Sequence, residues 1–99
     1  MTSAFLLQAY SDALETLLPL VGELSTSVDR LYLNIAIYHE EVGDYYLAYE
    51  FFRKWYHLCN DLYGPQHPKS LRPVNTLREP MYRRIAAEKG HEVPDLPSN

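Results

Sequence analysis

The sequence predicts an all-α domain of four to five helices, arranged as an antiparallel helix-turn-helix repeat. Apolar residues recur at spacings of three and four along most of the chain, as on the buried face of a helix. Glycines that can end successive helices stand at positions 22, 43, 64 and 90. No segment alternates apolar and polar residues as a half-buried strand does. Short connections between the segments favour antiparallel neighbours.

The first two helices are bounded by capping residues. Ser3 can cap a helix that ends at Gly22, with Pro19 making its last turn irregular. The Ser-Thr-Ser group at 25–27 offers N-caps for a second helix that ends at Gly43. Each segment carries an apolar face, so each is expected to pack on a neighbouring helix.

The third helix is expected from Asp44, a possible N-cap, to Leu62, with Gly64 closing it before a loop at 65–68. Its apolar residues form two adjacent stripes, so neighbouring elements must cover this helix on two sides. The first stripe is Tyr45, Ala48, Tyr49, Phe52, Trp55, Tyr56, Cys59 and Leu62, and the second is Leu47, Phe51 and Leu58.

The fourth segment is interrupted by prolines. Pro73 is expected in a first helical turn, and Pro80 then falls inside the same helix, where a proline costs about 3 kcal/mol. We therefore expect a break near 78–79. A second helix is predicted from Pro80 to Lys89, with Gly90 ending it.

Length and composition indicate one folded domain. The chain has 99 residues, 46% hydrophobic and 22% charged, a balance typical of globular proteins. The segment 91–99 contains two prolines and is expected to be a flexible C-terminal tail, which places the domain at 1–90. The chain starts without a basic segment, and no apolar run reaches ~18 residues. We therefore expect no signal peptide, no membrane partner and an intracellular location, cytoplasmic or nuclear.

Charge is unevenly distributed along the chain. The net charge of -4 gives no reason to expect a nucleic acid or an anionic membrane as partner. Nine acidic and three basic residues precede position 62, whereas six basic and four acidic residues follow it. This asymmetry has three interpretations: head-to-tail pairing of two copies, binding of an acidic peptide, or solvated helix faces.

The sequence contains no motif for catalysis or metal binding, so we expect no enzyme activity and no cofactor. The four histidines have no ligand-like spacing. Neither a glycine-rich phosphate loop nor a G-x-S-x-G motif is present. Cys59, the single cysteine, stands in an apolar stretch and is expected to be a buried small hydrophobe.

The chain repeats weakly with a period of about 42 residues. A shift of this size aligns Gly22 with Gly64 and Tyr10 with Phe52, so that helix ends fall on helix ends. The pattern indicates a two-helix unit. The chain then holds the second helix of one unit, a whole unit, and the first helix of a third.

Residues 31–58 resemble the tetratricopeptide repeat. The resemblance rests on Tyr32, Ile35-Ala36, Gly43-Asp44-Tyr45, Ala48 and Phe52. The loop at 62–68 is similar to the Gly-x-x-His-Pro loop of kinesin-light-chain-type repeats, and a similar helix–loop–helix end occurs in SET/MYND lysine methyltransferases. The sequence departs from the repeat at His39, where an aromatic residue is usual, and at Trp55, where a small one is. The break near Pro80 suggests an end cap or an assembly surface.

The resemblance implies a groove for a protein or peptide partner, lined by the first helix of each unit. Carried over to this sequence, the lining comprises Arg30, Leu33, Asn34, Ile37, Glu40 and Glu41, with Arg72, Asn75 and Arg83 from the third unit. Asn34 is notable because asparagine is intrinsically unfavourable in the middle of a helix and its amide can hold a peptide backbone. A solvent-facing asparagine explains the same residue equally well.

A surplus of aromatic residues needs a cover, because about three such units are usually required to bury their own faces. The candidates for an assembly surface are Tyr46, Tyr49, Phe51, Trp55 and Tyr56. The cover can come from residues outside this chain, a second copy forming a homo-oligomer, a partner, or the first and fourth helices.

Our main hypothesis is a non-catalytic adaptor or scaffold module that binds a peptide or protein partner or assembles with itself. One alternative is a regulatory helical region of a larger enzyme, such as a SET/MYND-type methyltransferase. Another is weak nucleic-acid binding through the basic residues of the second half.

Overall fold

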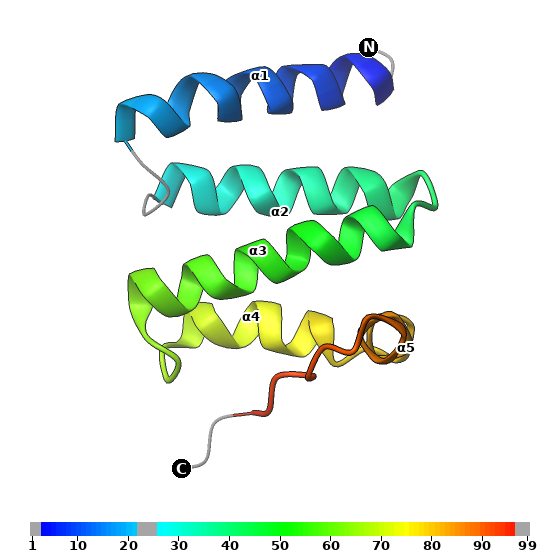
Figure 1. The fold of residues 1–99 in the computed structure, drawn as a ribbon. Helices are drawn as coiled ribbons and strands as arrows, with labels where there is room; N and C mark the ends of the chain where they lie inside the picture. The colour runs from blue at the N-terminus through cyan, green and yellow to red at the C-terminus, as the bar shows by residue number, and fades with distance from the viewer. Residues whose placement is uncertain (1–2, 22–25, 97–99) are drawn as a thin grey trace.

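The computed structural model describes residues 3–21 and 26–96, with side chains at 7–16 and 26–96. These residues form five α-helices and no strand, as predicted (Figure 1). The helices are α1 (Ser3–Val21), α2 (Thr26–Glu41), α3 (Tyr45–Tyr63), α4 (Pro68–Leu77) and α5 (Pro80–Lys89). Gly22, the expected end of the first helix, lies outside the described residues. None of the described helices has the length and apolar character needed to cross a membrane.

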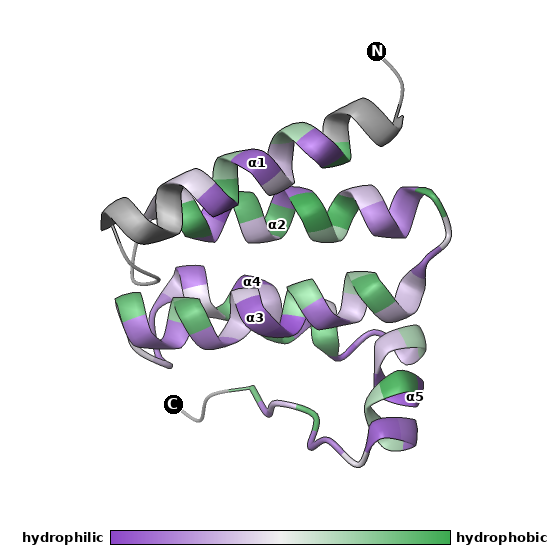
Figure 2. Cartoon of the chain, turned by 45° about the horizontal axis from the view of Figure 1, so that its top comes forward, coloured by the Kyte–Doolittle hydropathy of each residue, from purple (hydrophilic) through white to green (hydrophobic). Residues whose placement is uncertain are grey.

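Four of the helices lie side by side, and the fifth crosses them. α1 to α4 follow one another in a layer, each packed against the next, whereas α5 is seen end-on beside them (Figure 1). α3 is the central element, because α2, α4 and α5 all pack against it. Hydrophobic and polar stretches alternate along α2 and α3, as an amphipathic helix requires (Figure 2).

Three of the four corresponding bounds of the helix pairs α1–α2 and α3–α4 share one offset, whereas the ends of α2 and α4, Glu41 and Leu77, are 36 positions apart. α1 begins at Ser3 and α3 at Tyr45, and the two helices end at Val21 and Tyr63. α2 begins at Thr26 and α4 at Pro68. Each of these three pairs is 42 positions apart, which is the period indicated by the sequence.

Both ends of α3 are formed by the residues expected there. Asp44 is the N-cap, and its Oδ1 accepts a hydrogen bond from the backbone N–H of Leu47 at 3.2 Å. Gly64 ends the helix with φ +90° and ψ 152°, a conformation that is nearly restricted to glycine. Its N–H donates to the carbonyl oxygen of Asn60 at 2.9 Å.

The start of α4 corrects the prediction made for Pro73. The helix begins at Pro68, so Pro73 lies in its interior and is fully buried instead of standing in a first turn. Two start signals act earlier in the chain. Pro68 occupies the first turn, and the Nδ1 atom of His67 accepts a hydrogen bond from the backbone N–H of Lys69 at 3.0 Å.

The predicted break near 78–79 is confirmed. α4 ends at Leu77, and Glu79 has an extended backbone with φ -63° and ψ 145°. The ring of Pro80 disfavours a helical conformation at the residue before it, which explains this turn. Because of the break, α5 leaves the direction of α4 and packs across α3. Gly90 then ends α5 in the left-handed conformation, with φ 71°.

The segment 91–96 folds back onto the helices, which differs from the flexible tail expected from residue 91. Tyr49 Oη lies 2.9 Å from His91 Nδ1, and Val93 packs against the core. Arg78 donates to the carbonyl oxygen of Pro94 at 3.1 Å and lies 3.6 Å from the carboxylate of Asp95. These contacts extend the folded part of the chain beyond the boundary predicted at residue 90.

Candidate functional site

A groove runs between α2 and α4, and α3 forms its floor. It consists of two adjoining hollows of about 590 and 420 Å³, which share the lining residues Leu33, Trp55 and Arg72. α2 and α4 run in the same direction on either side of α3 (Figure 1). The groove therefore has two helical walls and is open along its length.

Seven of the nine residues predicted for a partner-binding groove line these hollows. They are Arg30, Leu33, Asn34, Ile37, Glu40, Arg72 and Asn75. Glu41 and Arg83 line neither hollow. Glu41 is the last, exposed residue of α2, and Arg83 belongs to α5, which the break at 78–79 carries away from the line of α4.

The floor of the groove is aromatic and largely buried. The side chains of Phe52 and Trp55 are each 3% exposed, and Cys59 is 1% exposed, which confirms its predicted burial. The guanidinium carbon of Arg72 lies 5.5 Å from the centre of the Trp55 ring, within the range of a cation–π contact. The basic side chain of one wall is thereby held over the floor.

Asp29 is a functional candidate that the sequence prediction missed. Its Oδ1 accepts hydrogen bonds from Trp55 Nε1 at 2.5 Å and from Cys59 Sγ at 3.6 Å. Its Oδ2 accepts one from Tyr63 Oη at 3.2 Å. Asp29 stands four residues before Leu33 on the same row of α2, so the helical spacing alone was enough to place it on the groove wall.

Burial and the Asp29 network raise the pKa of the thiol and of the phenol that hydrogen-bond to Asp29. Burial, followed by the charge and hydrogen bond of Asp29, raises the pKa of the Cys59 thiol to about 12. The same causes, in the same order, raise the pKa of the Tyr63 phenol. Both groups therefore stay protonated at neutral pH, and the thiol is not available as a thiolate nucleophile.

The two ends of the groove carry opposite charge. At the end where α2 and α4 begin, the basic residues Arg30 and Lys69 line the groove beside Asp29, and Arg72 lies where the two hollows adjoin. At the other end it includes Glu40 and Glu79. The groove can therefore distinguish the two directions of an elongated charged ligand.

The five aromatic residues considered for an assembly surface do not form one surface. Tyr49 is 2% exposed and Trp55 is 3% exposed, because other helices of the same chain cover them. Phe51 and Tyr56 are half-buried. Tyr46 is 53% exposed, and its hydroxyl donates to Glu88 at 2.7 Å. Tyr49 and Trp55 are thus not available to a second copy in this conformation.

Among the described side chains, no group of three or more His, Cys, Asp or Glu residues is placed to hold a metal ion. Comparisons of the chain with models of protein families, with curated proteins and with solved structures find no match. The groove between α2 and α4 is therefore interpreted from its own chemistry.

Proposed function

We propose that this chain is a non-catalytic, intracellular protein-interaction module that binds a peptide or protein segment in the groove between α2 and α4. The observation that carries the proposal is the convergence of seven expected residues, including Asn34 and Asn75, around one open groove with an aromatic floor. An apolar floor with a few polar groups on its walls is the usual composition of a binding site.

The proposal includes an architecture of the tetratricopeptide type, serving as an adaptor or scaffold. The offset of 42 residues between the bounds of α1 and α3, and between the starts of α2 and α4, supports a repeated two-helix unit. In such repeats the inner helices present side chains to a concave surface. α2 and α4 occupy that position here, on either side of α3.

The charges of the groove favour one orientation of the bound segment. An acidic residue of the partner fits beside Arg30 and Arg72, and a basic residue fits beside Glu40. Opposite charges at the two ends mainly determine specificity and the rate of association, whereas the apolar side chain of Ile37, 38% exposed on the wall, supplies area for a partner to bury.

A position-specific crosslinking experiment tests the groove. A photoreactive amino acid is introduced at Asn34 or Asn75 on the two walls, and at Asp61, an exposed position outside the groove, as control. We expect a partner to be crosslinked from the wall positions and not from Asp61. The crosslink should be lost when Ile37, which is 38% exposed on the wall, is replaced by Glu. Equal crosslinking from Asp61 would contradict binding of the partner in the groove.

The captured segment can then be studied quantitatively through the protein's own fluorescence. Trp55 is the only tryptophan of the chain and lies on the floor of the groove. A synthetic peptide of the captured segment should change its emission saturably. Ile37→Glu should weaken binding by about tenfold or more, as expected for a buried interface contact. Far-UV circular dichroism of the variant checks that the helices are retained.

A further inference from the structure

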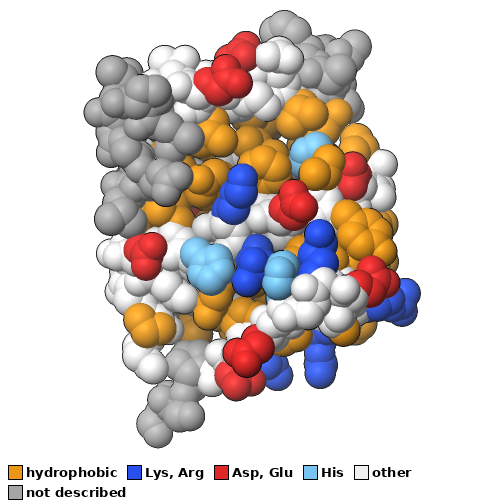
Figure 3. All heavy atoms as spheres, in the orientation of Figure 1, with side chains coloured by type: hydrophobic (Ala, Val, Ile, Leu, Met, Phe, Trp, Pro, Cys, Tyr) orange, Lys and Arg blue, Asp and Glu red, His pale blue; other side chains and the backbone are white. Residues whose placement is uncertain are grey.

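A second, basic hollow lies on the side of α3 that faces away from the groove. It has a volume of about 240 Å³ and is lined by Tyr49, Glu50, Arg53, Lys54, His57, Lys89 and His91. With 3.6 residues per turn, Arg53 and His57 project from α3 about half a turn away from Trp55 and Cys59. Histidine, lysine and arginine side chains form a row across this face (Figure 3).

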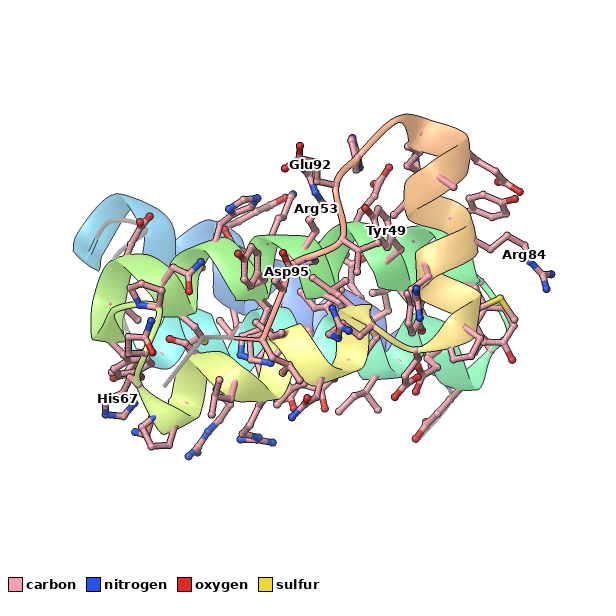
Figure 4. All side chains as sticks on the ribbon, turned by 90° about the horizontal axis from the view of Figure 1, so that it is seen from below. Tyr49, Arg53, His67, Arg84, Glu92 and Asp95 are labelled. Carbon is pink, nitrogen blue, oxygen red and sulfur yellow. The ribbon has the colours of Figure 1, made fainter. Side chains whose placement is uncertain are left out.

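The crossing of α5 over α3 assembles this hollow from distant parts of the chain. Tyr49 Oη lies 2.9 Å from His91 Nδ1, and the two rings are stacked with centroids 5.9 Å apart. This contact places the end of α5 beside Arg53. Tyr49 and Arg53 lie under the C-terminal segment that carries Glu92 and Asp95, whereas Arg84 points away from this region (Figure 4).

The positive charges of the hollow are only partly neutralised by the protein. Lys89 Nζ lies 3.6 Å from a carboxylate oxygen of Glu50, and Lys54 Nζ lies 4.8 Å from the centre of the Phe51 ring. Arg53 forms no ion pair with any residue that the structure describes. Arg53 is half-buried and His57 is exposed, so both can contact a ligand without rearrangement of the helices.

The surroundings of the hollow favour a compact anion over a long one. Glu50 lines it, and Glu92 and Asp95 lie on the neighbouring C-terminal segment. The chain as a whole carries a net charge of -4. These carboxylates repel an extended polyanion such as a nucleic acid or an anionic membrane. The volume of the hollow, about 240 Å³, admits a single phosphate group.

We propose that the hollow formed by Arg53, His57, Lys89 and His91 binds a phosphate monoester carried on a phosphorylated side chain of a partner protein. The planar guanidinium of Arg53 can donate two parallel hydrogen bonds to phosphate oxygens. His57 supplies a further donor from α3 and Lys89 from α5. The half-buried ring of Tyr56 lines the adjoining hollow and supplies apolar surface for the peptide around the phosphate.

Nuclear magnetic resonance titration of the full chain with O-phosphoserine tests this site, with serine as the unphosphorylated counterpart. We expect saturable shifts of the resonances of Arg53, His57 and residues 89–91 with phosphoserine and none with serine. Arg53→Gln should weaken binding by about tenfold or more, the effect of losing a charge-assisted hydrogen bond. His57→Gln should weaken it independently. The matched control, Arg84→Gln, should bind as the wild type does.

Two further probes separate the proposal from its competitors. Tighter binding of a short oligothymidylate, or of phosphatidylserine vesicles, than of a phosphoserine peptide would overturn it in favour of a nucleic acid or a membrane. Shifts that persist in both Arg53→Gln and His57→Gln would overturn it as non-specific attraction. Since the hollow faces away from Trp55, phosphoserine should leave the tryptophan emission unchanged, and Ile37→Glu should leave phosphoserine binding intact. Peptide binding in the groove and phosphate binding in the hollow are therefore tested independently.

Discussion

The carboxylate of Asp29 joins the first turn of α2 to three side chains of α3. It receives hydrogen bonds from Trp55, Cys59 and Tyr63, which follow one another along one side of α3. Hydrogen bonds to an ionised acceptor are stronger than those between neutral groups. At the scale of single residues, Asp29 therefore holds the floor of the groove together, and it adds to the effect of burial in raising the pKa of the Cys59 thiol.

The Cys59 thiol should react very slowly in the folded protein. It is 1% exposed, and its pKa is raised to about 12, so the thiolate fraction at neutral pH is negligible. Ellman's reagent should modify it readily in denaturant and only at the rate of unfolding in buffer. Asp29→Asn, which removes the adjacent charge and destabilises the floor, should speed the native reaction. Rapid labelling of the native wild type would contradict this assignment.

His91 should make the stability of the protein sensitive to mild acid. Burial, with the charges of Arg53 and Lys89, lowers the pKa of its imidazole. Because the pKa is lower in the folded state, the neutral imidazole of His91 contributes to stability. This contribution to the free energy of unfolding is fully present above the unfolded pKa of about 6.5 and is lost as the pH falls through the folded-state pKa. Between roughly pH 8 and 5, the urea midpoint should fall more steeply in the wild type than in His91→Gln. The same decrease of the urea midpoint with pH in both proteins would refute the prediction.

At the scale of elements, the junction between α3 and α4 depends on one buried hydroxyl. Ser70 is fully buried, and its Oγ lies 2.7 Å from the carbonyl oxygen of Gly64 and 3.1 Å from that of Cys59. The hydroxyl thereby joins the first turn of α4 to the end of α3 and to Gly64, whose carbonyl oxygen also accepts from the backbone N–H of His67 at 3.2 Å. The positive φ of Gly64 brings the chain into position for this contact.

Ser70→Ala should lower the free energy of unfolding by about 0.5–1.5 kcal/mol, because it removes the hydrogen bonding of a fully buried hydroxyl. The matched control is Thr76→Ala. The Thr76 hydroxyl donates to the carbonyl oxygen of Arg72 one turn earlier, at an exposed position, so its loss should change stability by less than about 0.5 kcal/mol. Urea denaturation of the two variants measures the difference. Equal effects would show that the buried hydroxyl has no special role.

At the scale of the whole molecule, α5 and the segment after it tie the ends of α2 and α3 together. Tyr82 Oη donates to Glu40 at 2.5 Å, Tyr46 Oη to Glu88 at 2.7 Å, and Tyr49 pairs with His91. Burial, followed by the hydrogen bond to Glu40, raises the pKa of the Tyr82 phenol. This hydroxyl therefore remains a donor at neutral and alkaline pH.

Tyr82→Phe should destabilise the protein by about 1–2 kcal/mol, because the ring is 1% exposed and the lost hydrogen bond joins a charged group. Tyr46→Phe is the control, because it removes a similar bond between exposed residues and should have little effect. Thermal unfolding followed by circular dichroism compares the two. A larger loss in Tyr46→Phe would show that α5 is not held through Tyr82.

Local signals in the sequence were enough to predict most helix bounds. Asp44, Gly64 and Gly90 act within one turn of the chain, so their effects do not depend on distant contacts. The break before Pro80 is local for the same reason. The start of α4 was predicted wrongly because His67 is an uncommon N-cap, and Pro73 was read as the start signal in place of Pro68. Self-assembly, cellular location and the identity of the partner stay predictions.

The sequence by itself determined the all-α class, the order of the helices and most of the groove wall, because side chains at helical spacing share a face wherever the helix is placed. Only the tertiary structure decided which faces meet. It buried Tyr49 and Trp55 within the chain, brought Asp29 onto Trp55, and turned Arg83 away from the groove. It also folded residues 91–96 back beside Arg53. These outcomes depend on the angles at which α2, α4 and α5 each pack on α3, and such angles follow from packing between distant residues.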